Sequence, residues 1–254
     1  MSNQNAFERL CVVLVNTRNP LNIGAAARAM SNFGFAHLRV VNPFKLAFRE
    51  ARSAVGAAPL LARTKEFKSV AEAVADCSLV VGTTALSRRN PEHVVRELQQ
   101  GARVIRKRLA AGNVALLFGS EKRGLSNEDL SHCHWLMRIP TREEHRSMNL
   151  GQAVAVCLYE LARDGKPAAE KGKVAHASAG DLERLTSLLR EVLQASGYLK
   201  TAAGKAASKR SAAPVEEKVR RFVRRLNLSA TDAQLLAGML RQTDWKLRTS
   251  AKLG

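Results

Sequence analysis

The sequence predicts an α/β domain with a mostly parallel sheet, followed by a small all-helical domain. Short, valine-rich apolar runs alternate with segments of helical periodicity as far as residue 163. Beyond a stretch rich in Gly, Ala, Lys and Pro, only helical periodicity remains. Alternating strands and helices are typical of parallel sheets. We therefore expect one domain at residues 1–165, a linker at 166–179 and a helical domain at 180–254.

Five apolar runs have the length and composition of buried strands. Continuous runs rich in Val, Leu and Ile indicate strands that are covered on both faces. These runs are residues 10–15, 37–41, 78–84, 113–118 and 135–139.

Helical periodicity separates these runs. Asn22 is an expected N-cap and Gly34 an expected C-cap of a helix at 23–33, and Ser69 caps a helix at 69–76. Residues 44–66 have no clear pattern, although 52–58 are compatible with a helix. The remaining helices expected in the first domain are residues 94–109, a turn from 127, and 149–163, which has an apolar face and many small residues.

Three helices are expected in the last domain, at residues 181–193, 214–226 and 229–247. The second begins with Pro214, which favours a helix start, after a basic loop at 200–213. Spacings of three and four residues predict one basic and one apolar face on it. The basic face comprises Arg221, Arg224 and Arg225, and the apolar face Val219, Phe222, Val223 and Leu226.

The charge of the chain is its most unusual property. The 254 residues carry a net charge of +19. Residues 164–254 hold 18 basic and 9 acidic residues, and the remainder holds 23 and 13, so both parts are basic. Charged runs are usually only solvated faces, but this excess predicts that both parts contact a polyanion.

The four cysteines are single and no Cys-x-x-Cys pair occurs. No apolar run approaches the length of a membrane span, and residues 1–5 lack a signal-peptide pattern. We expect a cytoplasmic protein with buried, reduced thiols and no membrane partner. The run His132-Cys133-His134 lacks further ligands, so we expect no metal.

Three polar loops follow predicted strands, at residues 16–22, 119–124 and 141–149. Carboxyl ends of parallel strands lie at one edge of a sheet, where ligands bind. The loop 119–124 has the two-glycine spacing of a phosphate loop, but Leu125 and Ser126 stand where Lys and Ser or Thr are required. No Gly-x-Gly-x-x-Gly run occurs either, so nucleotide hydrolysis and dinucleotide redox chemistry are both disfavoured.

Three motifs in these loops resemble those of the SPOUT (TrmH superfamily) RNA 2′-O-ribose methyltransferases. They are Asn22-Ile-Gly-Ala-Ala-Ala-Arg28, Gly119-Ser-Glu121-Lys-Arg-Gly-Leu125 and Ser147-Met-Asn149-Leu150. Their order and separation fit as well, and the helical extension resembles the TrmJ-type subfamily. The resemblance implies a deep trefoil knot, a homodimer, S-adenosylmethionine as cofactor and methylation of tRNA at position 32 of the anticodon loop.

The same resemblance assigns residues of this chain to the site. It makes Arg28, Ser147 and Asn149 catalytic. It assigns Asn22, Arg28 and Glu121 to the substrate side, with Glu121 also fixing its loop, and the basic face of Arg221, Arg224 and Arg225 is expected to bind tRNA. The residues expected to bind the cofactor are Thr83, Thr84, Ala85, Gly119, Ile139, Arg146, Ser147 and Met148.

The role of Arg28 has two readings, because a guanidinium stays protonated in nearly all proteins. Arg28 either loses its proton transiently and acts as the base, or stays charged and stabilises the developing alkoxide. Two other functions also remain open. One is a ribosomal RNA ribose methyltransferase of the same superfamily, and the other is a non-catalytic RNA-binding protein with the same fold.

Overall fold

The structure is a computed structural model that describes residues 7–43, 58–85, 92–163, 175–199 and 209–250. The possible helix at 52–57, the basic loop at 87–91, and most of the linker and of the loop 200–213 lie outside these ranges.

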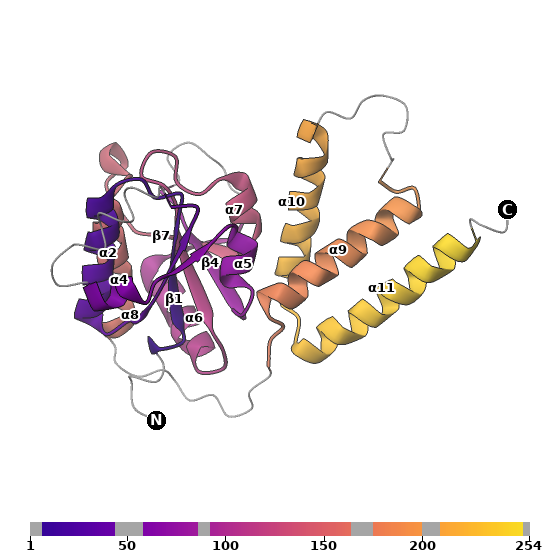
Figure 1. Cartoon of the computed structure of the whole chain (residues 1–254), viewed down its shortest axis with the longest axis horizontal. Helices are drawn as coiled ribbons and strands as arrows, with labels where there is room; N and C mark the ends of the chain where they lie inside the picture. The colour runs from indigo at the N-terminus through magenta and orange to yellow at the C-terminus, as the bar shows by residue number, and fades with distance from the viewer. Residues whose placement is uncertain (1–6, 44–57, 86–91, 164–174, 200–208, 251–254) are drawn as a thin grey trace.

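The described chain forms one sheet flanked by helices, and then three further helices (Figure 1). The strands are β1 (Leu10–Val15), β2 (His37–Val41), β3 (Lys65–Phe67), β4 (Leu79–Thr83), β5 (Val95–Glu97), β6 (Val114–Phe118) and β7 (Trp135–Arg138). The helices are α2 (Pro20–Phe33), α4 (Ala58–Ala62), α5 (Val70–Val74), α6 (Leu98–Leu109), α7 (Asn127–Ser131), the 3₁₀ turn η1 (Glu143–His145), α8 (Leu150–Arg163), α9 (Ala179–Ala195), α10 (Lys209–Arg225) and α11 (Ala230–Ser250).

The sheet has seven strands in the order β3-β2-β1-β6-β4-β7-β5. Every pairing is parallel, which confirms the predicted α/β fold. The central strands are the apolar runs expected from the sequence. The trefoil knot is not tested by this strand order and stays a prediction.

The strands alternate between two cores because successive side chains point to opposite faces. Leu10, Val12 and Leu14 of β1 belong to a core that also includes residues of α2, α4, α6 and α8. Cys11 and Val13 belong to the opposite core, with residues of α5, the end of α7 and Ala179 at the start of α9. All four cysteines are buried and free, as expected.

Helices α2 and α8 pack closely because their contact residues are small. A Cβ added to Gly151 would lie 2.6 Å from Cβ of Ala25. Gly34 ends α2 with φ +78°, as its C-cap, in the left-handed conformation that glycine favours. Gly151 at the start of α8 therefore serves packing within the chain.

Several predicted boundaries are wrong. Helix α2 begins at Pro20 with Asn19 as its N-cap, whose side chain accepts a hydrogen bond from the Leu21 amide at 2.9 Å. Residue 94 does not begin a helix, because the three-residue strand β5 precedes α6. The edge strand β3 was not predicted either. Helix α10 begins at Lys209, before Pro214.

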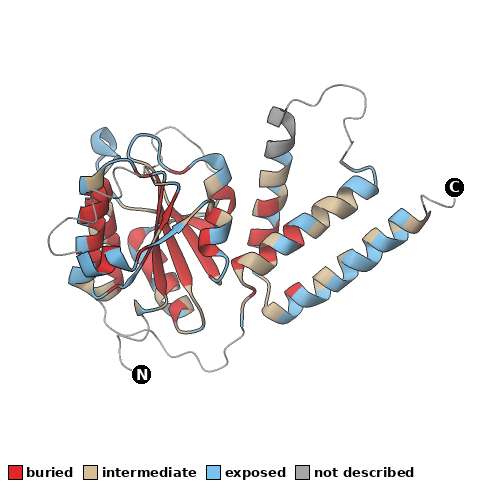
Figure 2. Ribbon diagram, viewed as in Figure 1, coloured by how far each residue is buried: buried red, intermediate tan, exposed pale blue. Residues whose placement is uncertain are grey.

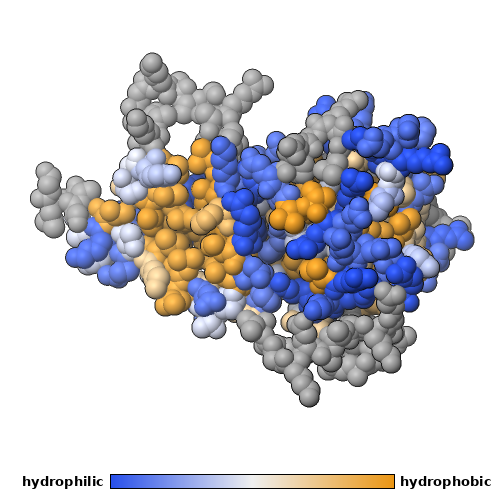
Figure 3. Space-filling view, turned by 180° about the vertical axis from the view of Figure 1, so that it is seen from behind, coloured by the Kyte–Doolittle hydropathy of each residue, from blue (hydrophilic) through white to orange (hydrophobic). Residues whose placement is uncertain are grey.

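Helices α9, α10 and α11 share a small core of their own, centred on Leu182, Leu185 and Val223. Helix α9 packs against both other helices, and the group lies beside α5 and α7 (Figure 1). Much of α11 is exposed (Figure 2). Seen from behind, the helical region presents a broad apolar surface (Figure 3). Its exposed apolar side chains include Phe222, Leu226, Leu235 and Met239.

Candidate functional site

The carboxyl edge of the sheet brings together the loops singled out in the sequence. Strands β1, β6, β4 and β7 are neighbours and all run in the same direction. The segments that follow them are 16–19, 119–126, 84–85 and 139–149. The predicted convergence of three motif loops at one edge is therefore confirmed.

A chain of hydrogen bonds joins one residue from each motif. The Asn22 side-chain amide donates from Nδ2 to Oε1 of Glu121 at 3.0 Å. Its Oδ1 accepts from Nδ2 of Asn149 at 2.8 Å. Oδ1 of Asn149 in turn accepts from the amides of Gly151 at 2.9 Å and Gln152 at 3.3 Å. We call Glu121, Asn22 and Asn149 the motif relay; it connects the Gly119 loop to the start of α8 through α2.

Glu121 also holds the loop before α2. Its carboxylate accepts hydrogen bonds from the backbone amides of Arg18 at 3.4 Å and Asn19 at 3.2 Å. Burial alone would raise the pKa of Glu121, but the bonds donated by Asn22 and by the amides outweigh burial, so its pKa is lowered. Glu121 is therefore a charged acceptor that fixes two motif loops against each other.

Gly119 is required by its own loop. A Cβ on Gly119 would lie 2.1 Å from the carbonyl carbon of Gly124 and 2.1 Å from the amide nitrogen of Leu125. The Gly124 amide donates to the Ser120 carbonyl at 2.8 Å, and Gly124 has φ +68°. The loop thus closes on its own backbone, and this close approach requires glycine at position 119.

The residues expected to bind the cofactor lie at or after the ends of β4, β6 and β7. Oγ1 of Thr83 donates to the Leu117 carbonyl at 2.9 Å, and the Thr84 amide donates to Met137 at 3.0 Å. Thr83, Thr84 and Ala85 are half-buried, as are Ile139 and Met148, whereas Arg146 and Ser147 are exposed. Among the residues that the structure describes, no hydrogen bond is donated by the Ser147 or Met148 amide. Such amides suit a ligand recognised through backbone groups.

An open pocket of about 400 Å³ lies at η1, and its lining consists of Arg142, Glu143, Glu144 and His145. This segment directly precedes Arg146, whose carbonyl accepts from Oγ1 of Thr141 at 3.4 Å. None of the predicted cofactor residues lines the pocket itself.

Arg28 lies on α2, six residues beyond Asn22, and is exposed. Within the described ranges, no hydrogen bond or ion pair joins it to the motif relay. The structure therefore brings Asn22, Glu121 and Asn149 together, with Ser147 two residues before Asn149, and leaves the Arg28 side chain on the surface.

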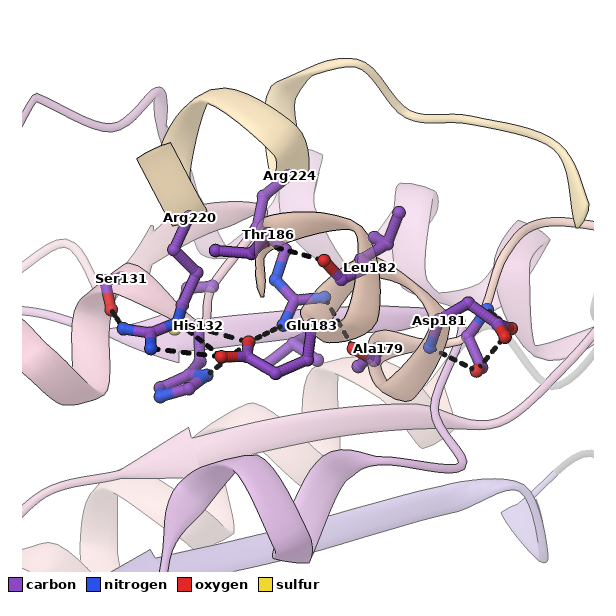
Figure 4. Close-up of polar contacts among 12 residues, drawn as sticks. Ser131, His132, Ala179, Asp181, Leu182, Glu183, Thr186, Arg220 and Arg224 are labelled. Carbon is purple, nitrogen blue, oxygen red and sulfur yellow. Dashed lines mark hydrogen bonds and ion pairs between the residues drawn. The ribbon is translucent and has the colours of Figure 1, made fainter. Parts of the chain in front are cut away.

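The predicted basic face of α10 is wrong (Figure 4). Arg224 is only 2% exposed, whereas Phe222 and Leu226 of the predicted buried face are 47% and 41% exposed. Nη2 of Arg224 contacts Oε2 of Glu183 at 3.2 Å. Arg221 pairs with Glu92 at 2.9 Å, and Arg225 alone of the three is exposed. Arg221 and Arg224 are drawn to partners within the chain, because acidic and carbonyl groups lie opposite them.

Two side chains were missed in the sequence. Asn19, not Asn22, caps α2; Pro20 was the available signal, because proline favours the first position of a helix. Arg220 pairs with Glu183 and Glu216, and no periodicity could have indicated those partners.

Two kinds of feature are absent from the described residues. They contain no group of three or more His, Cys, Asp or Glu side chains placed to hold a metal ion. Within the same ranges, no helix is long and apolar enough to cross a membrane. His134, from the run considered above, accepts a hydrogen bond from the Val80 amide at 3.1 Å.

Comparisons with known proteins agree on one family. The model of the SpoU rRNA Methylase family matches residues 9–159. The tRNA (cytidine/uridine-2′-O-)-methyltransferase TrmJ of Sodalis glossinidius is 34% identical over 235 residues, 90% of this chain and 89% of that protein. TrmJ of Klebsiella pneumoniae is 32% identical over 92% of this chain and 96% of its own length. The crystal structure of TrmJ from Z. mobilis ZM4 superposes with a TM-score of 0.77 at 29% identity, covering 91% of this chain and 97% of that one.

Proposed function

The chain belongs to the SpoU rRNA methylase family, and we propose that it methylates a ribose 2′-hydroxyl of tRNA with S-adenosylmethionine. The family is the one that the three motifs resembled, which confirms that expectation. The tRNA substrate is supported by TrmJ relatives that match both the sheet-containing part and the helical region. Because these relatives are named as enzymes, a non-catalytic RNA-binding role is disfavoured.

The observation that carries the proposal is the motif relay. A protein that only bound RNA would have no need to fix Glu121, Asn22 and Asn149 against one another at one edge of the sheet. The relay sets the start of α8 by fixing Asn149, which caps the Gly151 and Gln152 amides. Ser147 lies two residues before this cap, so the relay also constrains where the 146–149 segment lies.

The cofactor fits the residues at this edge. Thr83 ends β4 and is followed by Thr84 and Ala85, while Ile139 and residues 146–148 lie beyond β7. The Ser147 and Met148 amides are available to hold its polar groups, and Gly119 keeps the neighbouring loop closed. S-adenosylmethionine would supply an electrophilic methyl group on a sulfonium.

The residues of the chain then have to manage one proton and one developing negative charge. With the cofactor bound, transfer of its methyl group to the 2′-oxygen would release the hydroxyl proton to solvent and leave S-adenosylhomocysteine as the second product. We assign Arg28 to the alkoxide: a charged guanidinium stabilises developing negative charge, and the exposure of Arg28 leaves it accessible to RNA. Ser147 and Asn149 orient the acceptor ribose beside it.

We propose the pyrimidine at position 32 of the anticodon loop as the target. This position follows from the resemblance to the TrmJ-type subfamily. Methyl transfer from labelled S-adenosylmethionine to total tRNA, with modified positions mapped, tests it, and ribosomal RNA serves as the parallel substrate. Labelling of ribosomal RNA alone would favour the other branch of the superfamily, and labelling of neither would contradict the proposed reaction.

We propose that residues 1–165 form the methyltransferase domain, joined by a linker at 166–179 to a helical, tRNA-contacting domain at 180–254. A separate core in α9, α10 and α11 supports the division. Arg225 is exposed on α10, as is Lys218, while Arg221 and Arg224 are used within the chain. We therefore assign the phosphate contacts of α10 to Arg225 and Lys218.

Replacing both residues with Gln should weaken tRNA binding and leave cofactor binding unchanged. Removing one phosphate contact should reduce the log–log salt slope by roughly 0.7 to 0.9. The measurement is tRNA affinity against salt concentration. An unchanged slope would exclude Lys218 and Arg225 as the phosphate contacts of α10.

We also propose a homodimer. Tyr159 of α8 and Leu21 of α2 are 52% and 79% exposed, on the pair of helices that packs around the motif relay. Tyr159→Arg should shift light scattering from dimer to monomer. Leu235→Lys, on the separate apolar surface of α11, is the comparison. Dimers disrupted only by Leu235→Lys would move the interface to the helical region, and a wild-type chain that is monomeric would contradict the dimer.

A further inference from the structure

A cluster of polar side chains lies where α9 and α10 meet the end of α7 (Figure 4). We call it the interdomain arginine cluster. Its members are Ser131, His132, Glu183, Arg220 and Arg224. Ser131 and His132 come from the sheet-containing part, and the other three come from the helical region. The two arginines are 6% and 2% exposed, so both guanidinium groups are removed from bulk solvent.

Arg220 bonds to both parts of the chain. Its Nη1 donates to Oγ of Ser131 at 2.9 Å. Its Nε donates to the Glu183 carboxylate at 3.0 and 3.1 Å, and its Nη2 donates to Oε1 of Glu216 at 2.8 Å. Oγ of Ser131 donates onward to the Glu128 carbonyl at 2.6 Å, which fixes the direction of the hydroxyl. One guanidinium therefore joins α7, α9 and α10.

Arg224 extends the same junction. Its Nη1 donates to the Ala179 carbonyl at 3.0 Å, and its Nη2 to Glu183 at 3.2 Å. The Ala179 amide donates to the Cys77 carbonyl at 2.7 Å, and the Gly180 amide to the Ala75 carbonyl at 2.9 Å. The start of α9 is thus bonded on one side to the end of α5 and on the other to α10.

The cluster keeps its one histidine neutral. Burial, together with the positive charges of Arg220 and Arg224, lowers the pKa of His132 to about 3. Nδ1 of His132 lies 3.7 Å from Oε2 of Glu183. Glu183 is therefore the acid that balances the two buried arginines, with Glu216 assisting Arg220.

The desolvation of buried charges offsets most of the stability that such a junction could contribute. Two buried guanidinium groups lose hydration, and apolar side chains of similar size often hold an interface at least as well. Directional bonds in a fixed fork, in contrast, permit only one relative placement of the joined elements. The feature that these contacts explain best is a fixed orientation of the helical region.

The orientation matters because of the segments that the junction contacts. Helix α7 directly follows the Gly119 loop and leads into β7, which ends before Ile139. Ala75 and Cys77, which receive the start of α9, directly precede β4, which ends at Thr83. The helical region is therefore fixed to the segments that lead into the proposed cofactor loops.

We propose that Arg220 is a positioning residue that sets the helical region relative to the methyltransferase site, so that tRNA contacting the helices presents its acceptor ribose to that site. The proposal rests on the proposed tRNA methylation. Arg220 acts through Ser131 and Glu183 and does not contact the substrate.

Arg220→Lys is the direct test, because a lysine keeps the charge and cannot reproduce bonds to Ser131, Glu183 and Glu216 together. Arg184→Lys is the matched control: Arg184 lies on α9, is exposed and pairs with Asp181 within the same helix. Ser131→Ala is the second test variant. It removes the Arg220–Ser131 bond across the junction, together with the local bond from Oγ of Ser131 to the Glu128 carbonyl, and leaves the Arg220–Glu183 pair in place.

The first readout does not depend on activity. Spin labels on cysteines introduced at Arg63 and Gln242, both exposed, report the distance between the two parts. The four native cysteines are buried, so the labels are directed to the introduced ones. Labelled chain is diluted with unlabelled chain so that only distances within a chain are recorded. We expect a broadened or shifted distribution for Arg220→Lys and Ser131→Ala, and an unchanged one for Arg184→Lys.

The second readout is the split between KM and kcat. Arg220→Lys should raise the KM for tRNA at least about fivefold, while kcat at saturating tRNA and the affinity for S-adenosylmethionine stay within about twofold. A distance distribution identical to that of the wild type, or a loss of kcat with unchanged KM, would overturn the proposal. If Arg220→Lys does not fold, Ser131→Ala carries both readouts. If the wild type does not methylate tRNA, the proposed function fails, and the distances alone decide whether Arg220 fixes the orientation.

Discussion

Breaking the motif relay at Asn22 should reduce methyl transfer without unfolding the protein. The Asn22→Ala variant loses the 3.0 Å bond to the Glu121 carboxylate and the 2.8 Å bond to Asn149. A hydrogen bond to a charged group contributes about 1.5 to 3 kcal/mol, and a neutral one about 1. Because Glu121 is exposed, its bond contributes an energy near the lower end of the range for a charged group, so the two bonds together contribute roughly 2 to 3 kcal/mol. If the transition state requires the relay, kcat/KM should fall roughly 30- to 150-fold.

A double-mutant cycle with Glu121→Gln separates a relay from two independent effects. Glutamine removes the charge and keeps the shape, so this change alone should cost about 1 to 1.5 kcal/mol, or roughly 5- to 12-fold in kcat/KM. In the double variant, Asn22 is already absent, so the fall in kcat/KM should be close to that of Asn22→Ala alone. The assay is methyl transfer to tRNA over a range of tRNA concentrations, after circular dichroism has confirmed folding.

Additive losses, within about 0.5 kcal/mol, would refute the relay, since uncoupled sites add. Asn113→Ala provides the control. Its Nδ2 donates to Oδ2 of Asp76 at 3.2 Å, directly before β6 at the amino edge of the sheet. It removes a comparable bond to a carboxylate, and kcat/KM should stay within about twofold.

Three further outcomes follow from the structure. Arg28→Ala should abolish methyl transfer and leave the calorimetric affinity for S-adenosylmethionine nearly unchanged; an equal loss of both would reassign Arg28 to the cofactor. Gly119→Ala should disrupt cofactor binding, because its Cβ would lie 2.1 Å from the backbone of Gly124 and of Leu125. Gly238→Ala on α11 is the control and should be tolerated, because no atom lies within 4 Å of the added Cβ. Equal effects of the two variants on cofactor binding would contradict the conclusion that the loop closes on Gly119. The hydrogen bond from Arg39 lowers the pKa of Asp76 to about 2, below the value of about 3.9 in the unfolded chain. The ion pair therefore stabilises the fold fully above about pH 4, and this stabilisation is lost as the pH falls towards 2. Urea midpoints across this range should fall less steeply for Asp76→Asn than for the wild type, and parallel curves would exclude the ion pair as the cause.

The central strands could be predicted because they are buried on both faces. A strand such as β1, with all six residues buried, must be a continuous apolar run. The edge strands β3 and β5 were missed for the opposite reason. Each has three residues, includes charged side chains and is half-buried or exposed, so neither leaves an apolar signal. Only pairing with a neighbour makes these segments strands.

The location of the site could be predicted, but its bonds could not. Each motif follows a strand, and parallel strands place their carboxyl ends together. The pairing of Asn22 with Glu121 and Asn149 depends on side-chain directions across about a hundred residues of sequence, which no local spacing contains. The motifs therefore marked the right residues, while Asn22 was also given the capping role that belongs to Asn19.

Helix α10 shows most clearly where sequence reasoning fails. Its pattern of Val219, Phe222, Val223 and Leu226 predicts an apolar buried face, yet only Val223 is fully buried. The prediction assumed that an arginine side chain is most stable when its charge is hydrated by solvent. Two buried arginines become acceptable when Glu183, Glu216 and the Ala179 carbonyl are already in place to accept their hydrogen bonds. The partners lie on α9 and earlier on α10 itself, so the inward face is decided by the acids opposite the helix. It follows that a basic helix in a chain of this charge contacts RNA only through the cations that the rest of the fold has left unpaired, and on α10 we assign that role to Lys218 and Arg225.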